Sequence, residues 1–135
     1  MRRIGFTHRL LDLCCCAGGA SMGYAKAGFH VTGVDIKEQP NYPFDFVQGD
    51  ALEYLKGNIS AFDVIHASPP CQGYSNHTGE DSQWVHHTKG RSECKMISVI
   101  RDAIPTGMPY VIENVIGARM YMLNPILLCL SLIHI

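Results

Sequence analysis

The sequence lacks the features that would place it in several common classes of protein. Its six cysteines form no C-x-x-C pair, the usual spacing of zinc ligands, and three consecutive cysteines cannot all direct their thiols at one metal. The apolar stretch 123–135 is too short to span a bilayer and is interrupted by Asn124 and Pro125. A formal net charge of −1 gives no global basic field, so nucleic-acid contacts would need a local basic patch. We therefore expect neither a metal site nor a membrane span.

A secretory leader is also not expected, because the first four residues, MRRI, are polar and no long apolar stretch follows them. The cysteines then indicate thiols in a reducing, cytoplasmic environment rather than a disulfide framework. What is present is a hydrophobic content of 47% with 17% charged residues in a chain of 135 residues. This balance is typical of one globular domain with a core.

Short apolar runs alternate with helical stretches along the chain. We expect strands at residues 9–13, 30–36, 44–48, 62–67 and 110–113, and helices at 20–27, 51–56 and 92–104. Gly28 and Gly57 are predicted to end the first two helices, and residues 72–91 are predicted to form a long loop. Strands separated by helices predict an α/β fold with a parallel sheet, which binds ligands beyond the carboxyl ends of its strands.

Small residues and carboxylates follow the first three predicted strands. The turn 14–19 would let a ligand approach the backbone, and Asp35 lies 23 residues after Asp12, near the spacing of an acidic residue that binds ribose hydroxyls. Asp35 could instead cap a helix or face solvent, and Asp50 could bind an adenine amino group or cap a helix. The turn is not G-x-G-x-x-G and no G-K-[ST] follows it. The pattern favours a nucleoside-containing cofactor over a nucleoside triphosphate, and weakens a dinucleotide.

Reactive residues follow the last two predicted strands. Cys71 comes directly after two prolines, which restrict the backbone and direct the next residue, so it is a candidate nucleophile. Its alternative is a buried structural cysteine. Glu113 follows two aliphatic residues and is expected to be partly desolvated, which would suit a proton donor, unless it is a strand-end acid facing water. Asn114 could hold the neighbouring loops through its amide.

Taken together, these motifs resemble those of the cytosine-5 DNA methyltransferase family, especially its compact phage-like members. The resemblance rests on five motifs in the family's order, and it runs from about residue 10 to about residue 129. The motifs are the turn 12–19, Val34-Asp35, Gly49-Asp50-Ala51, Pro70-Cys71-Gln72 and Glu113-Asn114-Val115. The family usually has phenylalanine where Cys14 stands and glycine where Cys16 stands. A cysteine at position 16 adds a Cβ where the backbone would lie closest to the cofactor.

The resemblance implies a Rossmann-like, S-adenosylmethionine-dependent methyltransferase fold, with a parallel sheet and flanking helices, incomplete at the C-terminus. It implies methyl transfer from S-adenosylmethionine to C5 of cytosine in double-stranded DNA, with Cys71 adding to C6 of a flipped base and Glu113 contacting N3. The residues implied to bind the cofactor are Cys14, Ala17, Gly18, Gly19, Asp35, Ile36, Asp50, Ala51 and Pro70. Those implied to bind the substrate are Gln72, Ser75 and Asn114.

The resemblance also implies that residues 1–129 are the N-terminal part of the catalytic domain of a monomeric, cytoplasmic enzyme of bacterial or phage restriction-modification type. Residues 130–135 resemble a translated adapter or a frame error, and we expect them to be non-native. A sheet ending at its fifth strand is expected to expose an apolar edge and face. The alternatives are a non-catalytic cofactor-binding remnant, an RNA cytosine-5 methyltransferase, an amino-group methyltransferase and a redox or metal protein. His66 is expected to pack within its strand rather than act as a base.

Overall fold

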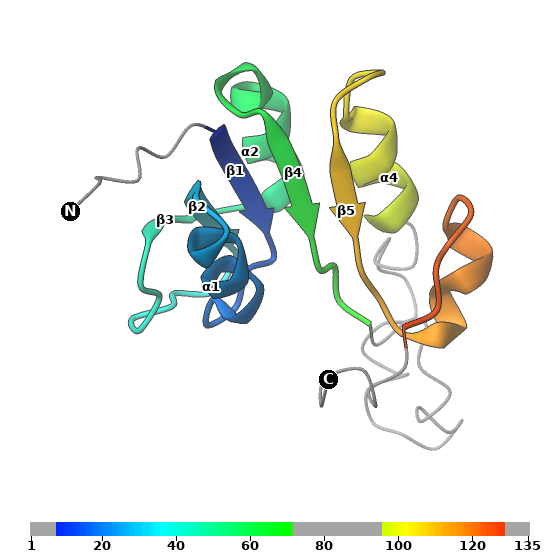
Figure 1. Cartoon of the computed structure of the whole chain (residues 1–135), viewed down its shortest axis with the longest axis horizontal. Helices are drawn as coiled ribbons and strands as arrows, with labels where there is room; N and C mark the ends of the chain where they lie inside the picture. The colour runs from blue at the N-terminus through cyan, green and yellow to red at the C-terminus, as the bar shows by residue number, and fades with distance from the viewer. Residues whose placement is uncertain (1–7, 72–95, 129–135) are drawn as a thin grey trace.

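The described residues form a single parallel sheet flanked by helices (Figure 1). The computed structural model describes residues 8–71 and 96–128. The sheet has the strand order β3-β2-β1-β4-β5, and every neighbouring pair is parallel. The predicted α/β fold is therefore confirmed. The strands are β1 (His8–Leu13), β2 (Phe29–Asp35), β3 (Asp45–Gln48), β4 (Val64–Ala67) and β5 (Tyr110–Ile112); the helices are α1 (Gly19–Lys26), α2 (Ala51–Asn58) and α4 (Met96–Ala103), with 3-10 helices η1 (Ile59–Ala61) and η3 (Ile116–Tyr121).

The predicted elements lie where they were expected, with a few differences at their ends. Gly28, with φ +98°, follows α1 as predicted, because its left-handed backbone ends a helix at little cost. Gly57 does not end α2: it lies within the helix, and η1 continues the coil through residue 61. β4 begins only at Val64, since Asp63 instead binds Arg9 through both its backbone N–H and its carboxylate. The predicted loop 72–91 and residues 92–95 lie outside the described residues.

The two faces of the sheet have different characters. α2 and α4 cover one face, where a fully apolar core gathers around Leu11, Leu13, Leu55, Ile65 and Ile100. α1 lies on the opposite face (Figure 1). Side chains alternate between the faces of a strand, so the residues between these leucines and isoleucines point toward α1.

On the α1 face, two buried polar residues lie side by side in one row across the sheet. Gly33 of β2, Asp12 of β1, His66 of β4 and Val111 of β5 are direct register neighbours. Asp12 and His66 are buried, at 1% and 4% exposure. This row lies one residue before the carboxyl ends of β1 and β4, and therefore directly beneath the edge where ligands are expected.

The last described part of the chain is rich in exposed apolar side chains. Tyr110 and Val111 of β5 are 40% and 48% exposed, and β5 pairs within the described residues with β4 alone. Further exposed apolar residues follow from η3 onward. The expected apolar edge and face are thus present in these ranges. Within the same ranges, no helix has the length and apolarity that crossing a membrane requires.

Candidate functional site

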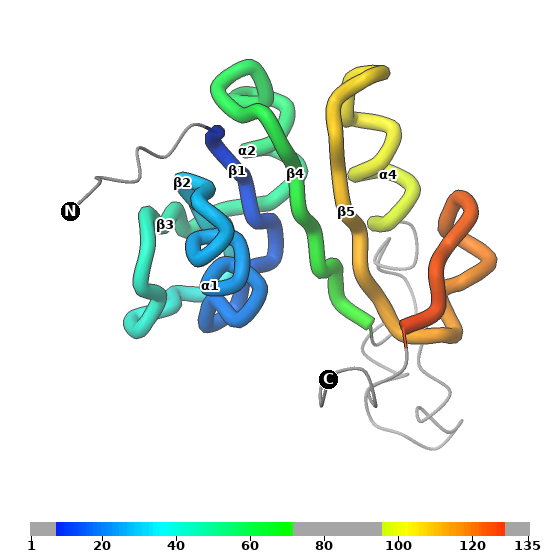
Figure 2. Tube along the Cα trace, in the orientation of Figure 1, coloured from blue at the N-terminus to red at the C-terminus, as the bar shows by residue number. Residues whose placement is uncertain are grey.

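All five strand ends that the sequence singled out open onto the same edge of the sheet. The strands are parallel, so the turn after β1, Asp35, Asp50, Cys71 and Glu113 all follow carboxyl ends. The trace in Figure 2 shows the chain leaving β4 and β5 toward the same end of the molecule. The order β3-β2-β1-β4-β5 also places the change in winding direction between β1 and β4, where a crevice for a ligand is expected.

Asp35 connects the turn after β1 to the end of β2. It is 7% exposed, and its Oδ2 accepts a hydrogen bond from the Cys16 backbone N–H at 3.0 Å while its Oδ1 accepts from the Lys37 N–H at 2.9 Å. The alternative of a helix cap is wrong, because the described chain has no helix between β2 and β3. Each carboxylate oxygen can accept a further hydrogen bond, so Asp35 suits a ligand that presents hydroxyl donors.

The turn after β1 has an unusual backbone. Cys14 and Cys16 have φ values of +58° and +47°, and Gly18 has φ +91°. Left-handed conformations cost a side chain with a Cβ about 1–2 kcal/mol, so two cysteines here are strained where glycine would not be. The position at which the family usually has glycine, Cys16, is therefore one where this fold demands a left-handed residue.

The three consecutive thiols are held protonated at neutral pH. Burial, and then the Asp35 carboxylate, raises the pKa of Cys14 to about 12, and burial, and then the Asp12 carboxylate, raises the pKa of Cys15 to about 12. Burial and the neighbouring Asp35 also raise the pKa of Cys16. A protonated thiol is a weak nucleophile and a poor metal ligand. Within residues 8–71 and 96–128, no three side chains of the metal-binding types come together.

The remaining residues expected around the turn differ in their exposure. Ala17 and Gly19 are exposed, whereas Gly18 is buried. The Cys14 side chain packs against the apolar core and is half-buried. A Cβ added at Gly19 would meet no atom within 4 Å, so the backbone at the start of α1 is open to a ligand. Of the residues in this turn, Ala17 and Gly19 are therefore accessible to a ligand and Gly18 is not.

The positions after β2 and β3 are also distinct. Ile36 is 66% exposed beside the buried Asp35, which leaves an apolar surface next to a carboxylate. Asp50 is the N-cap of α2, because its Oδ1 accepts the Glu53 backbone N–H at 2.8 Å. Of the two roles that the sequence allowed for Asp50, the structure therefore shows the helix cap. Ala51 is buried at the start of α2.

Cys71 lies exposed at the exit of β4. It directly follows Pro69 and Pro70, and the alternative of a buried structural cysteine is wrong. The Asn114 side-chain amide donates to the Pro69 carbonyl at 2.9 Å, which ties the exit of β5 to the segment that carries Cys71. The residue after β5 also stays bonded to the last residue of β4, since the Glu113 N–H donates to the Ala67 carbonyl at 3.0 Å.

Glu113 differs from the expectation. It was predicted to be partly desolvated, but its side chain is exposed. The reason is that β5 ends one residue earlier than predicted, at Ile112, and no described element covers this exit. Gln72 and Ser75, the other residues expected near the substrate, lie outside the described residues.

Sequence reasoning missed a buried polar network beneath this edge of the sheet. His66 Nδ1 lies 2.7 Å from Asp12 Oδ1, the Ser21 hydroxyl donates to Asp12 Oδ2, and the Tyr42 hydroxyl lies 2.7 Å from Ser21 Oγ. His66 is packed within its strand as expected, but with a polar partner. The available signal was Asp12 itself, a carboxylate inside an otherwise apolar buried strand, which must find partners when desolvated.

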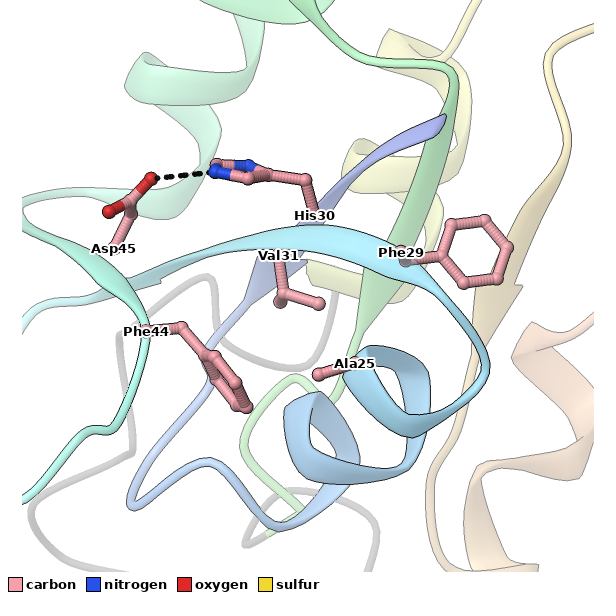
Figure 3. Close-up of a pocket in the computed structure, with 6 residues that line it drawn as sticks. All are labelled: Ala25, Phe29, His30, Val31, Phe44 and Asp45. Carbon is pink, nitrogen blue, oxygen red and sulfur yellow. Dashed lines mark ion pairs between the residues drawn. The ribbon is translucent and has the colours of Figure 1, made fainter. Parts of the chain in front are cut away.

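A hollow that is open to solvent lies away from this edge (Figure 3). It is bounded by α1 and by the beginnings of β2 and β3, with the His30–Asp45 ion pair of 3.4 Å on its rim. None of the residues that line it was singled out by sequence, and it lies at the opposite ends of the strands. We therefore place the candidate site at the carboxyl edge. The lining residues are Ala25, Phe29, His30, Val31, Phe44 and Asp45.

Known proteins with similar sequences share this region of the chain. The model of a family described as C-5 cytosine-specific DNA methylase matches residues 8–120. The Type II methyltransferase M.AquIA of Picosynechococcus sp. is 29% identical over 126 residues, which cover 81% of this chain and 49% of the relative. A Methanocaldococcus jannaschii protein, provisionally named ribosomal RNA large subunit methyltransferase MJ1649, is 33% identical over 79 residues, or 46% of this chain and 20% of the relative.

The chain therefore spans about half or less of the length of these relatives. Among solved structures, it is similar to the Entamoeba histolytica methyltransferase EhMeth with a TM-score of 0.56 and 21% identity, over 84% of this chain and 39% of that one. At this identity the likeness is one of fold. It confirms the methyltransferase fold that the sequence motifs implied.

Proposed function

The chain belongs to the C-5 cytosine-specific DNA methylase family, and from that premise we propose that it carries the cofactor-binding and nucleophile part of a DNA cytosine-5 methyltransferase. The observation that carries the proposal is that exposed Cys71 shares one sheet edge with Asp35 and with Glu113. The partner implied is double-stranded DNA, bound by a monomer in the cytoplasm. The chain spans about half of M.AquIA, so we propose that turnover depends on more than the elements described.

S-adenosylmethionine is the cofactor that the crevice fits. The Asp35 carboxylate has lone pairs free to accept ribose hydroxyls, and exposed Ile36 offers an apolar surface for an adenine ring. The open backbone at Gly19 begins α1, whose first N–H groups suit a carboxylate. When bound, this cofactor supplies an electrophilic methyl group. We propose that the residues holding it are Cys14, Ala17, Gly18, Gly19, Asp35, Ile36, Asp50, Ala51 and Pro70.

Cys71 is the proposed nucleophile. Its thiolate would add to C6 of cytosine, which breaks the C5=C6 double bond and makes C5 nucleophilic. C5 would then form a bond to the cofactor's methyl group, whose bond to the cofactor sulfur breaks. Later loss of the C5 proton and of the thiolate would restore the C5=C6 double bond. Glu113 would hydrogen-bond N3 and stabilise charge developing on the ring, and its exposure makes it accessible to a base. A cytosine inside a duplex cannot reach a sheet edge, so the base must be flipped out.

Asn114 has a supporting role in this proposal. Its amide already holds the Pro69 carbonyl, two residues before Cys71. That bond joins the exits of β4 and β5, so the thiol and the Glu113 carboxylate are set by a shared anchor. We propose that any contact of Asn114 with the substrate is secondary to this anchoring, with Gln72 and Ser75 as the further substrate-binding residues.

The test uses duplex DNA in which 5-fluorocytosine replaces cytosine, incubated with the chain and S-adenosylmethionine. Fluorine at C5 blocks the final elimination, so the Cys71 adduct is trapped and survives denaturing electrophoresis. We expect an adduct that Cys71→Ser abolishes and that Cys16→Ser retains, since Cys16 is also an exposed cysteine but has a raised pKa. If no adduct forms, even after the segments present only in the longer relatives are joined to the chain, the proposal is wrong.

RNA is the second candidate substrate. The observation in its favour is the 33% identity to a relative whose name concerns ribosomal RNA. The same experiment with a 5-fluorocytidine RNA of matching sequence separates the two. An adduct with RNA and none with DNA would replace the DNA assignment. Measurable cofactor binding with no adduct on either nucleic acid would instead identify a non-catalytic remnant.

A further inference from the structure

The α1 face of the sheet contains a buried carboxylate, and its neighbours must supply all of its hydrogen-bond partners. Asp12 is 1% exposed near the carboxyl end of β1, and both its oxygens have partners: Oδ1 meets His66 Nδ1 at 2.7 Å and Oδ2 accepts from the Ser21 hydroxyl. If a buried carboxylate loses a partner, one of its oxygens is left without either water or a hydrogen bond, and this destabilises the folded state. The imidazole of His66 is held in turn by the Tyr24 ring of α1, 5.2 Å away between centroids.

The directions of these hydrogen bonds follow from chemistry. An ionised carboxylate only accepts hydrogen bonds. His66 must therefore carry a proton on Nδ1, and the Ser21 hydroxyl must donate its one proton to Asp12. Ser21 Oγ can then only accept from the Tyr42 hydroxyl, 2.7 Å away. Burial raises the pKa of Tyr42, so this hydroxyl stays a donor. The result is one directed chain from Tyr42 through Ser21 to Asp12, closed from the other side by His66.

The Tyr42 ring packs against two glycines, Gly33 within β2 and Gly18 in the turn after β1. A Cβ added at Gly33 would lie 2.3 Å from the Tyr42 ring, and one added at Gly18 would lie 3.0 Å from it. Gly18 is the left-handed residue immediately before α1. The ring therefore packs directly against the turn after β1, and its hydroxyl joins that turn to the network below.

We propose that His66 and Tyr42 are positioning residues of the cofactor crevice, which hold the turn after β1 in place through Asp12 and Ser21. The proposal rests on the proposed function, because the crevice matters only if it binds S-adenosylmethionine. The network joins β1, α1, β4 and the β2–β3 connection, the elements that enclose this crevice. His66 also lies five residues before Cys71, so β4 carries an anchor for the cofactor side and the nucleophile on one short segment.

The experiment compares two substitutions of His66. His66→Asn keeps an N–H donor near the place of Nδ1, whereas His66→Leu removes it at a similar volume. We expect His66→Leu to raise the dissociation constant of S-adenosylmethionine, measured by calorimetry, by about tenfold, and His66→Asn to restore most of the affinity. Loss of affinity to the same extent in both variants would overturn a role for the hydrogen bond.

A double-substitution cycle with Tyr42→Phe distinguishes a shared network from two local effects. If both residues act through the same chain of hydrogen bonds, the double variant His66→Leu/Tyr42→Phe should bind the cofactor with about the affinity of the single variant that binds it less tightly. If they act separately, the fold-changes should multiply. Multiplying effects would overturn the proposal, since the hydrogen bonds that link Tyr42 to His66 run through Ser21 and Asp12.

Hydrogen exchange tests the positioning without any cofactor, and so separates failure of this inference from failure of the proposed function. In His66→Leu the Gly18 amide, which donates to the Cys15 carbonyl at 3.0 Å, should exchange about tenfold faster. The Tyr54 amide in α2, bonded to Asp50 at 3.0 Å, should not change. Equal acceleration at both amides would indicate general destabilisation and overturn the proposal, even if the wild-type chain binds the cofactor.

If His66→Leu does not fold, Tyr42→Phe alone carries the same test. It removes one hydroxyl, leaves the ring against Gly18 and Gly33, and keeps Asp12 paired with His66. Faster exchange at Gly18 with an unchanged Tyr54 amide would support the proposal. Unchanged exchange at Gly18 would refute it.

Discussion

Replacing Cys16 by glycine should stabilise this protein. Cys16 has φ +47°, a left-handed backbone in which its Cβ crowds the following carbonyl. The cost of that conformation is about 1–2 kcal/mol for a residue with a Cβ and close to zero for glycine. Glycine also loses more conformational entropy on folding, and this offsets part of the stabilisation that comes from relieving the strain. The expected net stabilisation is therefore about 1 kcal/mol.

The proper reference is Cys16→Ala rather than the wild type. The thiol lies next to the Asp35 carboxylate, which helps to raise the pKa of Cys16, and both variants lose that thiol equally. Alanine keeps the Cβ and the strain, whereas glycine removes them. The difference between the two variants therefore isolates the backbone contribution.

Urea and thermal unfolding followed by circular dichroism measure this difference. For a chain of 135 residues, about 1 kcal/mol corresponds to a melting temperature roughly 3–6 °C higher in Cys16→Gly than in Cys16→Ala. Equal stability of the two variants would refute the reasoning. It would mean that the turn after β1 relaxes out of the left-handed region when its side chain changes.

Three further predictions concern packing, the β4–β5 anchor and pH. Gly33→Ala should destabilise the fold by about 1–3 kcal/mol in urea unfolding, because its Cβ would lie 2.3 Å from the Tyr42 ring. Asn114→Ala should lower stability by about 1 kcal/mol and slow formation of the 5-fluorocytosine adduct, since the amide bond between the two strand exits is lost. The pKa values of Cys14 and Cys15 rise from 9.0 to about 12, mainly by burial, so their contribution to stability is intact below pH 9 and should be lost as the pH rises toward 12. Urea titrations across this range measure that loss.

Each of these predictions has a matched control. Gly57→Ala, in a helix where an added Cβ meets nothing within 4 Å, should be neutral or slightly stabilising, and destabilisation equal to that of Gly33→Ala would contradict the steric argument. Asn114→Asp keeps the shape but not the donor, so an adduct rate like the wild type's would argue against the anchor. A double Cys14→Ala/Cys15→Ala variant should lose less stability above pH 9 than the wild type. An identical loss would assign the effect to other groups.

Much of the fold could be predicted from the sequence because it depends on local patterns. Short apolar runs separated by helical stretches predicted the strands and helices to within a few residues, and the parallel sheet followed from their alternation. The carboxyl ends of the strands also follow from that order, so the positions of Asp35 and Cys71 at one edge were predictable. Gly57 was misread, because a glycine with an ordinary helical backbone does not end a helix.

The exposure of the site residues was less predictable. Two aliphatic neighbours suggested that Glu113 was partly desolvated, but burial depends on what packs over a strand end, and no described element covers this one. For Asp50, the sequence offered the right role but could not choose it over the other. Its two possible roles were both visible in the sequence, and only the position of the Glu53 amide showed that it caps α2.

The sequence by itself thus determined the order of elements, the chemistry placed after each strand and the family to which the motifs belong, because these depend on neighbours along the chain. Tertiary structure alone decided the pairings between distant residues. His66 meets Asp12 across 54 residues, and Asn114 meets Pro69 across 45. No local pattern encodes these contacts: they exist because β1, β4 and β5 become neighbours in one parallel register, which brings a buried carboxylate and a histidine into the same row.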